Sequence, residues 1–365
     1  MNRCARYWVA LGTLGCLAAA ALPSQADLGE SISTIFGGAV GAAGGDVNAD
    51  GRANAADISG LLLGLQNPTQ LGPYGSGWQR LTFTKKSETM PDKDRVLVTD
   101  VWYPAAAGTW KNDNRPGGQL KVPLASGLHN LPLVLFSHGS CGFSEQSIFL
   151  MRRLASWGFI VAAPPHPGNT TSEYVICETP EQLQDSFVNR PADIVFVTDQ
   201  LLALNEDPAS FFYGAIDPTR VGMSGHSYGG LTTLRVLARD ARFVAGLALA
   251  PVVDGIESET ASITQPLMIQ VGTLDDLLGN GRKGYDLTMG VRYRVEIDRM
   301  GHTPFSDFCL ECGPDSISLS DAHVFILRYA LPFLLHHVAG DARFDAFLEP
   351  DSTPAGVAYF RDLRS

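Results

Sequence analysis

The strongest constraint on the fold is a regular alternation, from Trp78 onward, of short apolar runs with amphipathic stretches. Alternation of this kind predicts a mainly parallel sheet flanked by helices. The expected strands lie at residues 80–85, 95–103, 131–137, 159–163, 220–224, 243–250, 267–271 and 291–297. The first two of these strands are expected to form a hairpin. We expect helices at residues 144–156, 190–204, 228–239 and 321–338, followed by a polar tail at residues 341–365.

The most specific motif follows the strand expected at residues 220–224. Residues 225–230 read GHSYGG, a G-x-S-x-G pattern placed between a strand and a helix. Small residues around Ser227 allow a sharp turn, which holds the serine hydroxyl above the sheet and beside the positive end of the following helix. The motif therefore predicts that Ser227 is a nucleophile.

A serine hydroxyl becomes reactive when a histidine accepts its proton, and after this motif the chain order is serine, acid, histidine. His302 lies in a loop just after the last strand, whereas the three later histidines lie on the final helix. We therefore expect His302 to be the general base. Asp275 follows a buried strand and is expected to orient the imidazole, with Asp254, after the preceding strand, as the alternative acid.

A tetrahedral intermediate also needs backbone N–H donors around its oxyanion. We expect one donor from Tyr228, directly after the nucleophile, and the other from Ser140 within residues 136–142 (FSHGSCG). His138 precedes the nucleophile and is expected to brace that loop. The side chains that we expect to line an acyl pocket are Phe143, Trp157, His166, Met300 and Phe305.

The first 26 residues have the order of a secretory signal peptide: Arg3 and Arg6, an apolar run at residues 7–22, and small residues up to Ala26. The run is shorter than the roughly 20 apolar residues that a membrane span needs. Cys16 follows Leu14 and Gly15 as in a lipoprotein cleavage site, so a lipoprotein is the alternative interpretation. We expect a secreted or periplasmic protein without a transmembrane segment.

The charge and the remaining cysteines fit an exported protein. The formal charge is −11, and residues 1–26 carry two arginines and no acid, so their removal leaves −13. Such a surface repels nucleic acid and anionic lipid. In an oxidising compartment two disulfides of open connectivity are expected among Cys141, Cys177, Cys309 and Cys312. Zinc is the alternative for the last two, but a second ligand pair is missing.

Residues 27–77 are rich in Gly and Ala and contain, at 46–57, the spacing of a calcium-binding loop. This loop resembles a single dockerin-type calcium repeat. The six expected ligands are Asp46, Asn48, Asp50, Arg52 through its carbonyl, Asn54 and Asp57. The alternative is a solvated linker. True dockerins carry two such repeats, so a cohesin-like partner is not expected.

Several separated motifs occur in the order of a known family. They are residues 133–139 (LVLFSHG), 154–168 (LASWGFIVAAPPHPG), 189–194 (NRPADI) and 225–230 (GHSYGG). Across about residues 95–338 the chain resembles the dienelactone-hydrolase-like and platelet-activating-factor acetylhydrolase-like group of the α/β-hydrolases. The resemblance implies a serine esterase, at residues 78–340, that needs no cofactor for its chemistry.

The chain departs from this family at informative positions. Dienelactone hydrolases use a cysteine nucleophile, whereas this chain has Ser227. Animal acetylhydrolases of the group carry their acid where this chain has Ala250, which favours Asp275. Cutinase-type polyester hydrolases share the architecture, although they usually have Met or Gln in place of Tyr228. Polyesters and phospholipid acetyl esters therefore stand as alternative substrates, and a calcium-dependent binding protein on an idle scaffold is the alternative outside catalysis.

Overall fold

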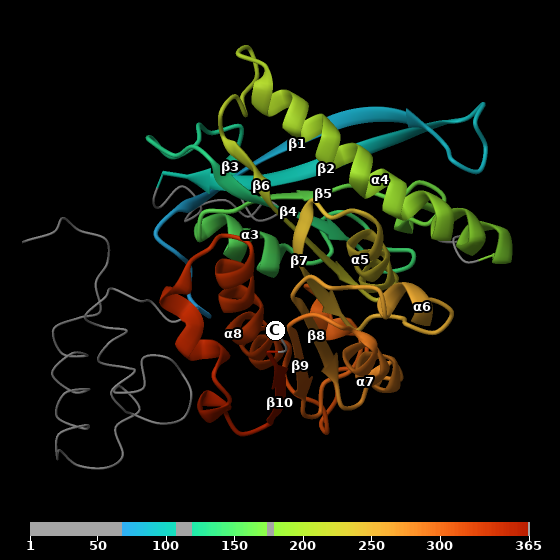
Figure 1. Cartoon of the computed structure of the whole chain (residues 1–365), viewed down its shortest axis with the longest axis vertical. Coiled ribbons are helices and arrows are strands. Elements are labelled where there is room, and N and C mark those ends of the chain that lie inside the picture. Colours follow the sequence, from blue (N-terminus) through green and yellow to red (C-terminus); the bar gives the residue numbers. More distant parts are fainter. Residues whose placement is uncertain (1–67, 107–118, 174–178, 364–365) are drawn as a thin grey trace, which may run out of the picture. The chain divides into compact units, whose positions relative to one another are not determined.

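The computed structural model describes residues 68–106, 119–173 and 179–363. Within these residues one ten-stranded sheet has the strand order β10-β9-β8-β7-β6-β4-β5-β2-β1-β3 (Figure 1). The strands from β4 to β9 run parallel to one another, while β2 joins β5, and β10 joins β9, in antiparallel orientation. This sheet, covered by helices, is the α/β-hydrolase fold that the sequence predicts.

The strands are buried most completely at the centre of the sheet. All seven residues of β4 are buried, as expected for a parallel strand with helices on both faces. The strands are β1 Gly75–Lys86, β2 Asp94–Ala105, β3 Gln119–Leu120, β4 Leu131–Ser137, β5 Ile160–Ala163, β6 Ile216–His226, β7 Phe243–Leu249, β8 Leu267–Gly272, β9 Arg292–Ile297 and β10 Val357–Asp362.

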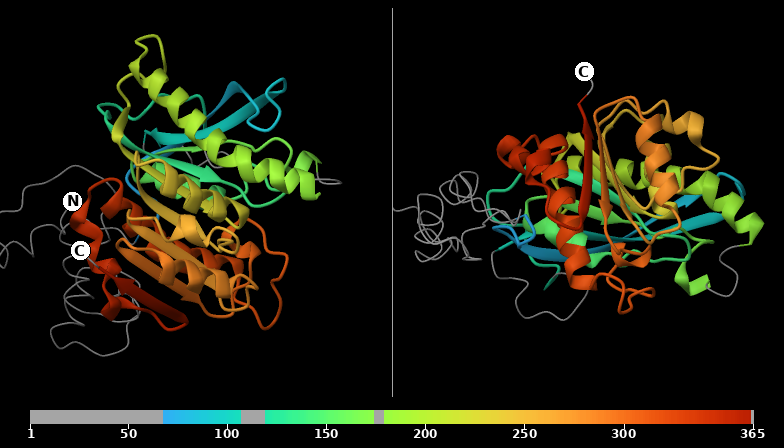
Figure 2. Two further views of the ribbon diagram at one scale, coloured as in Figure 1. Left: turned by 45° about the vertical axis from the view of Figure 1, so that its right-hand side comes forward. Right: turned by 90° about the horizontal axis from the view of Figure 1, so that it is seen from below.

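Helices cover both faces of the sheet. On one face α4, α5, α6 and α7 contact one another in succession, whereas α3 and α8 pack together. Figure 2 shows α8 and α7 on opposite sides of β8 and β9. The α-helices are α3 Ile148–Ser156, α4 Pro180–Glu206, α5 Tyr228–Arg239, α6 Glu257–Thr260, α7 Leu278–Leu287 and α8 Leu319–His337; the 3-10 helices are η2 Thr171–Glu173, η3 Thr303–Phe305, η4 Ala342–Leu348 and η5 Pro350–Ser352.

Helix α4 begins ten residues before the predicted start at Arg190. Thr179 accepts a hydrogen bond from the N–H of Gln182, whose side chain accepts in return from the N–H of Thr179, so the helix starts with a capping box. Pro191 lies inside the helix and removes one backbone donor without ending it. The early start adds Leu183 to the helix, and the carbonyl of this residue accepts from the hydroxyl of Tyr228.

Both expected ends of the catalytic domain need correction. Strand β1 begins at Gly75, and the N–H of Tyr74 already donates to the carbonyl of Ser156, so the sheet domain starts before residue 78. Residues 341–363, expected to be a polar tail beyond the catalytic domain, contribute to its sheet and core, because β10 pairs along β9 and Phe344 is buried. An edge strand of this kind depends on its partner more than on its own sequence pattern.

Some predictions fall outside the described residues. These are the signal peptide, the calcium loop at residues 46–57 and Cys177. By its contacts the chain divides into two units, the first of which consists of residues 1–47 and 53–65 and also lies there. Among residues 68–106, 119–173 and 179–363, none of the helices has the length and apolarity of a membrane span.

Candidate active site

The candidate nucleophile lies on a strained turn between β6 and α5. Ser227 has φ 58° and ψ −117°, a backbone conformation that residues other than glycine rarely adopt. Its N–H donates to the carbonyl of Leu249 at the end of β7, at 2.8 Å. A Cβ on Gly229 would lie 1.9 Å from the carbonyl oxygen of Ser137, so only glycine fits there. The turn is thus fixed by close packing on β4 and β7.

The candidate base meets a carboxylate from a neighbouring strand end. Nδ1 of His302, in the loop after β9, lies 2.9 Å from Oδ2 of Asp275, in the loop after β8. The Asp275 side chain is 1% exposed, and its other oxygen accepts from the N–H of Leu277 at 2.8 Å. With Nδ1–H donating to the carboxylate, Nε2 is left to accept a proton.

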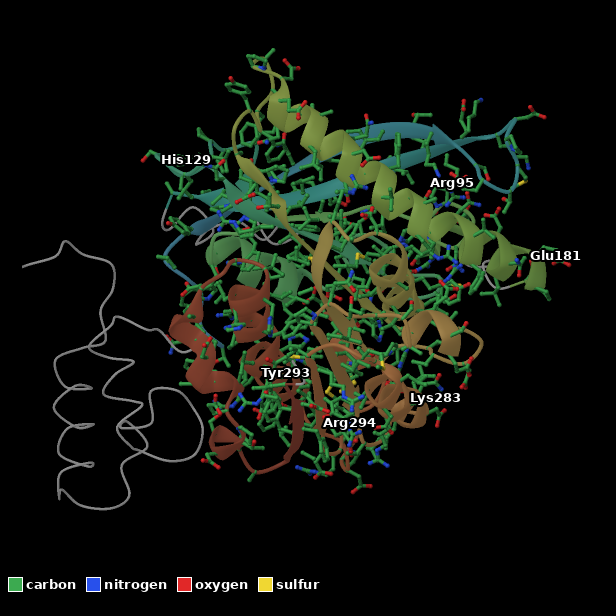
Figure 3. The ribbon with its side chains drawn as sticks, viewed as in Figure 1. Arg95, His129, Glu181, Lys283, Tyr293 and Arg294 are labelled. Atoms are coloured by element: carbon green, nitrogen blue, oxygen red, sulfur yellow. A yellow bond between two sulfur atoms is a disulfide. The ribbon has the colours of Figure 1, made fainter. Side chains whose placement is uncertain are left out.

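The alternative acid, Asp254, contacts other residues than His302. The side chain of Asp254 is 62% exposed and forms an ion pair with Lys283 of α7, which Figure 3 labels. Asp254 also accepts from the side chain of Asn280 at 3.2 Å. Of the two acids that sequence reasoning left open, Asp275 is the one that contacts His302.

Ser227 and His302 open into one cavity of about 400 Å³. A volume of this order is typical of small-molecule sites. The cavity is lined by Gly139, Ser140, Cys141, Gly142, Phe143, Gln146, Thr171, His226, Ser227, His302, Thr303, Ser306, Phe308 and Leu310.

Two backbone N–H groups are free to face a bound anion. Tyr228 is the first residue of α5, where a helical N–H has no acceptor within the helix. Ser140 lines the cavity, and within the described part of the chain its N–H donates to no backbone or side-chain acceptor. The N–H of Gly139, one residue earlier, is occupied by Oε1 of Gln146 at 2.9 Å.

The predicted pocket residues are placed unevenly. Phe143 lines the cavity, and its ring stacks on that of Phe308, with centroids 6.4 Å apart. Met300 and Phe305 are fully buried and do not line it, which corrects the prediction because both side chains belong to the core. Trp157 is half-buried elsewhere, where it donates to the carbonyl of Gln70.

His166 is also corrected, from a pocket residue to a buried bridge. Its Nδ1 lies 3.1 Å from Asp193 and its Nε2 lies 2.9 Å from the hydroxyl of Ser137. Burial first, and then the nearby arginines, hold the pKa of His166 well below its ordinary value. His138 is buried beside it and donates from Nδ1 to the carbonyl of Gly139 at 2.7 Å, as expected for a residue that braces this loop.

His226, the variable residue of the GHSYGG motif, has a role that the sequence did not predict. Burial and the neighbouring His302 keep its pKa well below the ordinary value, so the ring is neutral. Gln146 donates to its Nδ1 at 2.8 Å, and its Nε2–H donates to the carbonyl of His302 at 3.0 Å. His226 therefore connects the loop that carries His302, through Gln146, to the loop at residues 138–142 in which the oxyanion donor Ser140 is expected (the oxyanion loop). Its position next to Ser227 was the available signal.

The rim of the cavity is held by a disulfide between Cys309 and Cys312. Between them Glu311 accepts hydrogen bonds from the N–H and the hydroxyl of Thr303, directly after His302. Cys141 is disulfide-bonded as well. The described residues contain no group of three or more His, Cys, Asp or Glu side chains able to hold a metal ion.

Two family models match adjacent parts of the chain. The model described as "Platelet-activating factor acetylhydrolase, isoform II" matches residues 105–195, and the model described as "Prolyl oligopeptidase family" matches residues 192–282. The first match contains the oxyanion loop with Ser140, and the second contains Ser227 and Asp275.

Curated relatives are similar over longer stretches. Platelet-activating factor acetylhydrolase of Cavia porcellus is 28% identical over 346 residues, which covers 76% of this chain and 79% of the relative. The protein of the same name in Gallus gallus is 26% identical over 182 residues, 38% of this chain and 43% of the relative. Lipase 1 of Moraxella sp. (strain TA144) is 25% identical over 233 residues, 64% and 63%. Together with the sheet and its helices, these similarities identify the chain as an ester hydrolase with the α/β-hydrolase fold.

Proposed function

We propose that this ester hydrolase is a serine carboxylesterase that works through Ser227, His302 and Asp275 and passes through an acyl-enzyme. The observation that carries the proposal is the Asp275–His302 hydrogen bond, which lies beside the cavity into which Ser227 opens from its strained turn. Asp275 orients the imidazole and stabilises its protonated form.

The reaction has two halves. The Ser227 hydroxyl attacks the ester carbonyl while Nε2 of His302 takes its proton, and the proton then passes to the departing alcohol. In the second half water attacks the acyl-enzyme while His302 takes its proton, and the proton then returns to Ser227 as the carboxylic acid leaves. In both halves the N–H groups of Ser140 and Tyr228 donate to the oxyanion, and no acceptor in the described part of the chain competes for these two N–H groups.

For substrate, we propose an ester small enough for its acyl group to enter a cavity of about 400 Å³, with the alcohol part outside. Phe143 and Phe308, which are 38% and 39% exposed, give the entrance an apolar surface. Such an entrance suits phospholipid acetyl esters and polyesters as well as simple alkyl esters. Initial rates on p-nitrophenyl esters of increasing acyl length, a short-chain phospholipid and a polyester film rank the three.

The proposal is tested with a fluorophosphonate probe, which labels an activated serine. We expect the wild-type chain to be labelled and to hydrolyse p-nitrophenyl butyrate. Ser227→Ala should lose labelling and about 10⁴-fold or more in kcat. Ser306→Ala is the matched control, since Ser306 lines the same cavity but its hydroxyl donates to the carbonyls of Thr303 and Phe308. A folded wild-type chain that stays unlabelled refutes the proposal.

We further propose export from the cytoplasm and calcium binding at residues 46–57. The Cys309–Cys312 disulfide and the bonded Cys141 support export, since such bonds persist in oxidising compartments. The ligand spacing supports calcium as a structural ion without a part in catalysis. Calcium should then raise the melting temperature of the full-length chain, because it binds the folded state.

A further inference from the structure

Arg190 is a fully buried arginine that lies behind the oxyanion loop and has no part in the proposed chemistry. It extends from α4, and its guanidinium donates to three oxygens around that loop. One nitrogen donates to the carbonyl of His138 at 2.6 Å, and the other donates to the carbonyl of Gly139 at 3.0 Å and to Oδ1 of Asn169.

The bond to Gly139 fixes the direction of the next N–H. The carbonyl of Gly139 accepts from Arg190, from Nδ1 of His138 at 2.7 Å and from the N–H of Gly142 at 3.2 Å. A trans peptide is planar, so its C=O and N–H point in opposite directions. With the oxygen held toward these three donors, the N–H of Ser140 points away from them, and Ser140 lines the cavity.

Arg190 also contacts the second donor residue. Its guanidinium lies over the ring of Tyr228, 4.9 Å from the centroid. The hydroxyl of Tyr228 donates at 2.9 Å to the carbonyl of Leu183, which lies about two helical turns before Arg190 on α4. Asn169 links Arg190 to Ser140, because its side-chain amide donates to the Ser140 hydroxyl at 3.1 Å. The Arg190 side chain thus contacts both the peptide that precedes the N–H of Ser140 and the ring of Tyr228.

The guanidinium remains charged behind the loop. Burial lowers its pKa to about 9, which leaves it protonated at neutral pH. The charge of Asp193 opposes this lowering of the pKa, but the Asp193 carboxylate is itself held by Arg95 at 2.7 Å; Figure 3 labels Arg95 on β2. Lys85 is 3.9 Å from the same carboxylate. A positive charge in this dry position favours negative charge on the other side of the loop.

We propose that Arg190 is a positioning residue for the oxyanion hole. It holds the Gly139–Ser140 peptide and the ring of Tyr228 so that both N–H groups face the oxyanion. This inference rests on the proposed serine-esterase function. A residue in this role acts on the transition state rather than on the bound ester, so its loss lowers kcat and leaves KM nearly unchanged.

The experiment compares Arg190→Met and Arg190→Lys with Arg235→Met. Arg235 is a matched control, because it is also a buried arginine that lies over an aromatic ring, Phe187, and donates to its backbone carbonyl, but it does not contact the oxyanion loop. For each variant we measure kcat and KM on p-nitrophenyl butyrate and the Ki of a trifluoromethyl ketone. Serine adds to this ketone to form a hemiketal oxyanion.

We expect Arg190→Met to lose about 100-fold in kcat, the effect of one misplaced oxyanion donor, and its Ki to rise by a similar factor. Arg190→Lys keeps the charge but lacks the two-pronged fork, so it should fall between Met and wild type. Arg235→Met should keep its kcat and Ki even where its melting temperature falls.

The proposal is overturned if a folded Arg190→Met variant keeps the wild-type kcat and Ki, or loses activity only through KM. If neither Arg190 variant folds, the residue serves stability alone and the proposal is again overturned. A wild-type chain without turnover or probe labelling is a different result, because it refutes the serine-esterase function itself.

Discussion

The loop that carries His302 is held at both the side chain and the backbone of this residue. The Asp275 carboxylate accepts from Nδ1 of His302 at 2.9 Å. The backbone carbonyl of His302 accepts from Nε2–H of His226. A side chain that is 28% exposed would otherwise sample several rotamers. The two contacts leave Nε2 as the free atom of the ring.

Asp275→Asn tests the choice of acid. The neutral amide cannot stabilise the positive charge of the imidazolium, and it also permits the His302 tautomer whose proton is on Nε2. The kcat should therefore fall about 10³- to 10⁴-fold, while the melting temperature changes little. Asp254→Asn is the control and should keep its kcat within about two-fold, since Asp254 contacts Lys283 and not His302. Steady-state kinetics on p-nitrophenyl butyrate measure both. Equal losses in the two variants would contradict the assignment.

At the scale of elements, the β1–β2 hairpin contains an ion pair across its two strands, between the exposed side chain of Arg80 and the buried side chain of Asp100. Arg80 and Asp100 face each other in the register, and two guanidinium nitrogens lie 2.8 and 3.1 Å from the carboxylate. The indole of Trp78 donates to the same carboxylate at 3.1 Å. Burial, the largest influence, raises the pKa of Asp100 to about 6 in spite of these donors, and the charge of Glu145 adds to the rise.

This shift predicts how stability depends on pH. The folded-state pKa of Asp100 lies above the ordinary unfolded value, so its stabilising contribution is complete below about pH 4 and is lost as the pH rises through about 6. Asp100→Asn removes the titration. The unfolding free energy of the wild type, relative to that of the variant, should therefore be greater at pH 5 than at pH 7.5 by about 1 kcal/mol.

Urea denaturation at both pH values measures this difference. Asp94→Asn, at an exposed position of the same strand beside Lys86, controls for the loss of one carboxylate from β2. A relative stability of Asp100→Asn that does not change with pH, or that changes in the opposite direction, would show that the carboxylate is not desolvated.

At the scale of the molecule, the last 25 residues complete the sheet domain. Strand β10 covers the edge of β9, and Phe344, Phe347 and Leu348 are buried. The carbonyl of Ser352 accepts from the guanidinium of Arg328, which is itself buried on α8. Without this segment the edge of β9 would be left without its partner strand, and the guanidinium of Arg328 would lose this acceptor.

Deletion of residues 341–365 should therefore prevent folding to a soluble enzyme. Each buried aromatic or leucine side chain contributes about 1.5–3 kcal/mol, and three of them approach the whole stability of a typical domain. The measurement is the soluble yield and the melting temperature of the truncated chain. Deletion of residues 1–65, which supply none of the residues that line the cavity, should keep kcat/KM within about two-fold. A soluble, active chain that ends at residue 340 would contradict the prediction.

The sequence by itself determined the strands of the sheet other than β3 and β10, the strand-turn-helix at Ser227 and the position of His302 in the loop after β9. These features depend on local properties: burial repeats with the period of a strand or a helix, and a tight turn demands small residues wherever it occurs. The sequence also indicated an ester hydrolase, through motifs that keep their order along the chain.

Only the tertiary structure shows which of Asp275 and Asp254 contacts His302, because both follow buried strands and differ only in what lies across the sheet edge. The tertiary structure also shows that His166, Met300 and Phe305, which were predicted to line the cavity, are buried in the interior. It further shows that Arg190 contacts the oxyanion loop. The pairing of β10 with β9, within residues 341–363, is likewise visible only in the tertiary structure. Contacts between segments far apart in the chain depend on how the elements pack, and a single sequence records no signal of that packing in its local pattern.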